Sequence, residues 1–84
     1  MTTLADLRPG QGGRVAAIDA AGPLADGLGE AGFTRGADVA VLRRGPVGGT
    51  PLSVRVGRAV IALRKEEAAA VRLGDGPVDA ADGA

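Results

Sequence analysis

The run from Leu52 to Leu63 constrains the fold more than any other part of the sequence. In "LSVRV", Leu52, Val54 and Val56 alternate with polar residues, which is the pattern of a strand that buries one face. "GR" then provides a two-residue turn, and "AVIAL" supplies a second apolar row, Ala59, Ile61 and Leu63. The run therefore predicts a β-hairpin, and a chain of 84 residues must bury its apolar face within one small domain.

Shorter patterns on both sides of this hairpin predict more strands. Val39 and Val41 fall on one face of "ADVAVLRR". In "RVAAI", Val15 and Ile18 have opposite parity, so burying both requires a bulge or bend. The remaining predicted elements are a helical turn in "LADL", a loop over residues 45–51, a helical turn in "RKEEAAA" and a last strand, "VRL". Five short strands separated by turns predict a small, mainly β barrel.

The composition excludes several classes of function. There is no Cys or His, which removes the two commonest ligands of soft and borderline metals, and no cofactor or metal site is expected. Ten basic and ten acidic residues balance, and Phe33 is the only aromatic residue, so nucleic acid is not an expected partner. Glu66 and Glu67 are adjacent on a helical turn and diverge, so we expect no catalytic residues and no enzyme activity. No apolar run is long enough to cross a membrane, and we expect a cytoplasmic chain.

The stretch "GLGEAG", residues 27–32, has the G-x-G-x-x-G spacing of a dinucleotide-binding loop. That loop needs a strand before it and a helix after it, and neither pattern is present here. The stretch instead continues a helical stripe that contains Leu24, Leu28 and Ala31. We therefore predict that Gly32 ends a helix in the left-handed conformation, with Phe33 packed against Leu28.

The order and spacing of these features resemble the FeoA family of ferrous iron transport proteins. The matching pattern is a helix ending in "LGEAGFTRG", then "VAV", "GPVGGTPL", a strand pair and "IALRKEEAAAV", and "LADLRPGQGGRVAAI" resembles the family's start. The resemblance implies an SH3-like β-barrel of about five strands with one or two short helices, which we place at residues 1–73. Residues 74–84 contain Asp75, Asp79 and Asp82 with few apolar residues, and we expect a flexible acidic tail.

The resemblance also implies a small accessory protein of ferrous iron uptake, whose partner is the membrane permease with a cytosolic GTP-binding domain. An alternative is a regulatory module that works with an iron-dependent transcriptional repressor. A further alternative is a homodimer formed through an apolar patch or a strand edge. We expect the chain to act by protein–protein contact, without inserting into the membrane. The candidate contact residues are apolar side chains near the predicted loop and helix end, with two arginines that would steer the encounter: Leu28, Phe33, Arg43, Arg44, Pro46, Val47 and Leu52.

Overall fold

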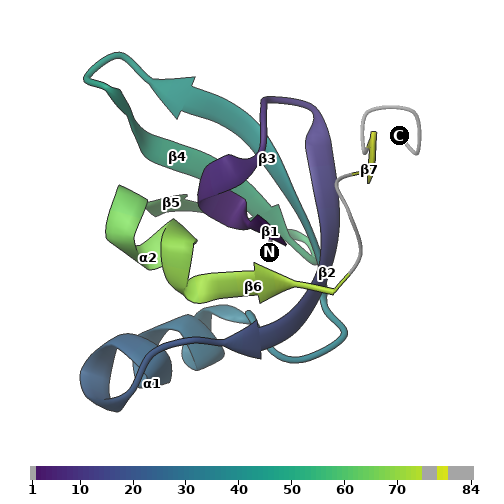
Figure 1. Ribbon diagram of the computed structural model, residues 1–84, viewed down its shortest axis with the longest axis vertical. Coiled ribbons are helices and arrows are strands. Elements are labelled where there is room, and N and C mark those ends of the chain that lie inside the picture. Colours follow the sequence, from purple (N-terminus) through teal and green to yellow (C-terminus); the bar gives the residue numbers. More distant parts are fainter. Residues whose placement is uncertain (1, 75–77, 80–84) are drawn as a thin grey trace.

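The computed structural model describes residues 2–74 and 78–79. Strand β2 (Gln11–Ile18) links two parts of its sheet. Its first half pairs with β3 (Asp38–Gly45), and its second half pairs with β6 (Val71–Leu73). The register shifts between Val15 and Ala17, which confirms the predicted bulge. Because a bulge bends and twists a strand, the sheet can curve around its own inner face (Figure 1).

The sheet of the described residues is antiparallel throughout, with the strand order β1-β6-β2-β3-β4-β5 and with β7 paired to β2. The strands not yet located are β1 (Thr2–Thr3), β4 (Gly49–Val56), β5 (Ala59–Leu63) and β7 (Val78–Asp79). The helical segments are the 3-10 turn η1 (Leu4–Asp6), α1 (Gly22–Ala31) and α2 (Lys65–Ala70). The predicted mainly β architecture with short helices is confirmed.

The core lies on the inner face of the sheet and is aliphatic except for Phe33. The alternation predicted for β4 is confirmed, because Leu52, Val54 and Val56 are all buried. Strand β5 follows its predicted row only in part, since Leu63 is buried but Ala59, next to the turn, is exposed. The other large buried side chains come from η1 and the residue after it, from α1, and from strands β2, β3 and β6: Leu4, Leu7, Val15, Leu28, Val39, Val41, Val71 and Leu73.

The two helical turns predicted near the chain ends are confirmed, and each is closed by an acidic side chain. The Thr3 N–H donates to Asp6 Oδ2 at 2.9 Å in η1, and the Arg64 N–H donates to Glu67 Oε1 at 2.7 Å in α2. These bonds satisfy backbone donors that the first turn of a helix leaves without a partner. The two segments pack against each other, and buried Ala68 joins α2 to the core.

Helix α1 ends as the glycine spacing predicted. Gly32 has φ 110°, the Gly32 N–H donates to the Gly29 carbonyl at 3.1 Å, and the Phe33 N–H donates to the Leu28 carbonyl at 3.0 Å. These are the two hydrogen bonds of a Schellman motif, and its hydrophobic pair, Leu28 and Phe33, is buried. The G-x-G-x-x-G spacing therefore marks a helix end, because Gly27 and Gly29 lie within the helix and no helix opens after Gly32.

One stretch differs from what the sequence alone indicated. The predicted loop over residues 45–51 is wrong, because Gly45 pairs with Gly49 and only Pro46 to Gly48 form the turn between β3 and β4. In the predicted tail, residues 75–77 and 80–84 lie outside the described residues. Val78 and Asp79 form the short strand β7, which pairs with Gly12 and Gln11.

Candidate protein-binding surface

Three of the predicted contact residues belong to the core. Leu28, Phe33 and Leu52 are 3%, 1% and 0% exposed. Leu28 and Phe33 are buried by the Schellman motif that joins them, and Leu52 is buried because it begins the inner row of β4. The expectation that these side chains touch a partner is therefore corrected, because all three belong to the hydrophobic core.

The two predicted arginines have different positions. Arg44 lies opposite Leu52 and is half-buried, and its Nη1 donates to the Leu7 carbonyl at 2.7 Å and to the Ala5 carbonyl at 3.3 Å. Its guanidinium also packs over Gly49, where an added Cβ would lie only 2.9 Å from Arg44 Nε. Arg44 therefore ties the β3–β4 hairpin to the segment around η1, whereas Arg43 is exposed.

A bulge in β3 explains why neighbouring arginines separate in this way. Val41 pairs with Val54 and Arg43 pairs with Ser53, so two residues of β3 face one residue of β4. The extra residue, Leu42, is left on the surface with an exposed fraction of 46%. Strict alternation from Val39 and Val41 already places Leu42 outside, but it also places Arg43 inside and Arg44 outside, so the two arginines are positioned correctly only once the bulge is known.

The described residues include three large hydrophobic side chains that are exposed: Leu42, Val47 at 74% and Val60 at 60%. Val47 stands at the tip of the β3–β4 hairpin, which projects beyond the rest of the sheet (Figure 1). Val60 lies on β5 opposite Arg55 of β4. Its outward position could be predicted from parity, since positions 59, 61 and 63 were the ones expected to face inward.

Strand pairing places Arg43, Arg55 and Val60 on one outer surface of the sheet, and the exposed residues Leu42, Pro46 and Val47 belong to the same β3–β4 hairpin. Ser53 connects Arg43 on β3 with Ala62 on β5, and the next outward residue along β4, Arg55, faces Val60. Neighbouring strands are about 4.8 Å apart. The long side chains of the row that contains Arg43 can therefore reach those of the row that contains Arg55 and Val60. We call this surface the hairpin face; it comprises Leu42, Arg43, Pro46, Val47, Arg55 and Val60.

The charges on the hairpin face have no ion-pair partner among the described residues. The one ion pair among the described residues lies elsewhere and joins Arg14 Nε to Asp38 Oδ1 at 3.2 Å. Both of these side chains are largely exposed. Arg43 and Arg55 are thus available to carboxylates of another molecule. Such exposed charges add to encounter rate and orientation more than to affinity.

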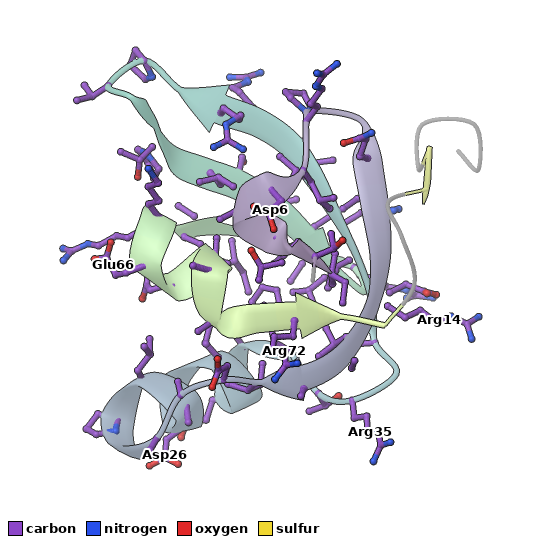
Figure 2. The ribbon with its side chains drawn as sticks, viewed as in Figure 1. Asp6, Arg14, Asp26, Arg35, Glu66 and Arg72 are labelled. Carbon is purple, nitrogen blue, oxygen red and sulfur yellow. The ribbon has the colours of Figure 1, made fainter. Side chains whose placement is uncertain are left out.

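The carboxylates of the described residues do not gather at one site. Asp26 lies on α1 and Glu66 on α2, and the two side chains point away from the protein in different directions (Figure 2). Within the described part of the chain, no group of three or more Asp or Glu side chains could hold a metal ion. The same residues contain no helix long and apolar enough to cross a membrane.

The sequence and the fold can now be compared with known proteins. A family model described as the FeoA domain matches residues 2–73. The chain belongs to the FeoA family. This membership makes it a small accessory protein of ferrous iron transport with the SH3-like fold that was expected.

Solved structures of FeoA proteins agree with this assignment. The protein from Stenotrophomonas maltophilia, described as a procaryotic SH3 domain protein in complex with zinc, is 35% identical over 88% of this chain and 91% of its own, with a TM-score of 0.78. Iron(II) transport protein A from Clostridium thermocellum is 29% identical over 86% of this chain and 44% of its own, with a TM-score of 0.80. FeoA from Chlorobium tepidum is 28% identical over 86% and 68%, with a TM-score of 0.78. None of the curated proteins compared with the chain matches it.

Proposed function

We propose that this FeoA protein is a cytoplasmic accessory factor that docks its hairpin face on the cytosolic GTP-binding domain of a ferrous iron permease. Family membership supports the role in ferrous iron transport. One observation carries the choice of surface: the exposed large hydrophobic side chains of the described residues all lie on β3, the β3–β4 turn or β5.

The physical basis is the free energy gained when apolar surface leaves water. Leu42, Val47 and Val60 gain little from folding because they remain exposed, and contact with a partner would bury them. Arg43 and Arg55 lie beside them and would orient an acidic partner surface. Arg44 holds the hairpin to the rest of the fold, so the surface is presented by a supported element.

The test is retention of the purified chain by the immobilised cytosolic domain of the permease. We expect the wild type to be retained, and the double variant Leu42→Ser with Val47→Ser to bind about tenfold more weakly. Pro23→Ser is the matched control, because Pro23 is an exposed apolar residue on α1, outside the hairpin face. No retention of the wild type, together with unchanged ferrous iron uptake after deletion of the protein, would refute the proposal.

A further inference from the structure

Among the strands that the structure describes, β5 has a partner along only one of its two edges. It pairs with β4 along all of Ala59–Leu63 with no register shift, and it ends the strand order of the described sheet (Figure 1). An edge of this kind presents a row of backbone N–H and C=O groups to its surroundings. Ala59, Val60 and Ala62 are exposed and Ile61 is half-buried, so the strand is accessible.

The composition of β5 is unusual for an edge that remains open. Natural edge strands carry charged residues, proline or a bulge that prevents pairing with another chain. Strand β5 reads Ala-Val-Ile-Ala-Leu and has none of these features. The strand at the other end of the sheet, β1, is protected by being only two residues long. Strand β5 is thus suited to receive another strand.

The charges at the two ends of β5 indicate what kind of strand it receives. Arg58 precedes the strand, and Arg64 and Lys65 follow it, all exposed. Asp38 lies beside the turn that contains Arg58, because the Gly57 N–H donates to the Asp38 carbonyl, but the Asp38 carboxylate is paired with Arg14. At the other end, the Glu67 carboxylate accepts a hydrogen bond from the Arg64 N–H, and Glu66 follows Lys65. Both ends of the strand are therefore flanked by cationic side chains.

These charges disfavour a second copy of the chain as the occupant. In the antiparallel register that pairs all five residues of β5 with their equivalents, Ile61 faces Ile61 of the other copy. The same register places Arg58 opposite Arg64 at both ends of the strand pair. Like charges directly opposite each other destabilise a strand pair. A partner segment with carboxylates at its ends is instead attracted to Arg58 and Arg64.

We propose that the free edge of β5 binds an extended segment of a partner protein, with an apolar middle and acidic residues at both ends, by strand addition. Backbone hydrogen bonds to β5 supply affinity, and Arg58 and Arg64 select the acidic ends. This inference rests on the proposed function, because it specifies how a partner that docks on the hairpin face would engage the adjoining edge.

A peptide experiment tests the edge directly. The probe is a blocked peptide with alternating valine and threonine between Asp-Glu and Glu-Asp ends, added to the full chain and followed by amide NMR and hydrogen exchange. We expect slower exchange of amides within Ala59–Leu63, and about tenfold weaker binding of the same peptide with lysines at its ends. Equal binding of the two peptides, or no protection of β5 at about 1 mM peptide, would overturn the proposal.

Charge reversal separates this inference from the proposed function. Arg58→Glu and Arg64→Glu should each weaken binding of the acidic-ended peptide several-fold. Arg8→Glu is the control, because Arg8 is exposed between η1 and β2 and the substitution changes the net charge by the same amount; it should leave peptide binding unchanged. If the permease domain does not retain the wild type but the peptide binds, the proposed function fails and strand addition stands. If the domain retains all three variants equally, strand addition fails. A dimeric wild type whose β5 amides are protected without peptide would assign the edge to a second copy.

Discussion

The end of α1 offers a test in which the same substitution has opposite effects at two positions of one segment. Gly27 lies within the helix, and a Cβ built there meets no heavy atom within 4 Å. Replacing it with alanine removes the helix penalty of glycine, so Gly27→Ala should raise the free energy of unfolding by about 0.8–1.0 kcal/mol. Gly32 has φ 110°, where any Cβ is disfavoured, and Gly32→Ala should lower the free energy of unfolding by about 1–2 kcal/mol.

The structure identifies the cause of the loss at Gly32 as the backbone conformation. A Cβ at Gly32 would lie 3.4 Å from Val56 Cγ2, which is an ordinary contact distance. The two variants should therefore differ by about 2–3 kcal/mol, or about 10–20 °C in Tm for a domain of this size. Gly32→Asn should be milder than Gly32→Ala, because asparagine is enriched at positive φ.

Thermal and urea unfolding followed by far-UV circular dichroism measures these differences, since the chain has no Trp or Tyr for fluorescence. Gly29→Ala is a second control in the helix, again with no heavy atom near the added Cβ. The reasoning fails if Gly32→Ala is as stable as the wild type, or if Gly27→Ala and Gly32→Ala shift Tm in the same direction.

Three further predictions concern the core, the hairpin and metal binding. Leu52→Ala, at a fully buried site, should lower the free energy of unfolding by about 2–5 kcal/mol in urea titrations, and a loss under 1 kcal/mol would contradict the burial described. Arg44→Ala should cost about 1.5–3 kcal/mol because the Leu7 and Ala5 carbonyls lose a charged donor, whereas Arg43→Ala should stay within about 0.5 kcal/mol in the same assay. Anaerobic calorimetric titration with Fe(II) should show no tight binding, and a low-micromolar Kd would contradict this prediction.

Local chemistry was sufficient to predict several features of this protein. The helix end at Gly32 follows from the conformational freedom of glycine and from two hydrogen bonds formed within a few residues. The buried row of β4 follows from period-2 alternation, which neighbouring residues in the chain express directly. The two-residue turn before β5 was predicted because "GR" stands between two such rows. The bulge in β2 followed from the opposite parity of Val15 and Ile18.

The candidate surface was only partly accessible from sequence. Arg43, Pro46 and Val47 were expected at the surface and are exposed, but Leu28, Phe33 and Leu52 are buried. Apolar side chains look alike in sequence whether they contact a partner or the core, because the hydrophobic effect does not depend on direction.

Tertiary pairing decided the remaining features, because they depend on residues distant in the chain. The seven residues after Arg44 are rich in glycine and proline and indicated a loop, yet pairing across the hairpin leaves a turn of three. The register of β3 against β4 places Arg43 outside and Arg44 against the segment around η1, which the alternation within β3 does not predict. The open edge of β5 likewise exists only once the strand order is set. The sequence by itself determined where segments turn and which face each strand of clear alternation buries, whereas strand register, and with it the surface left for a partner, was decided by contacts between segments.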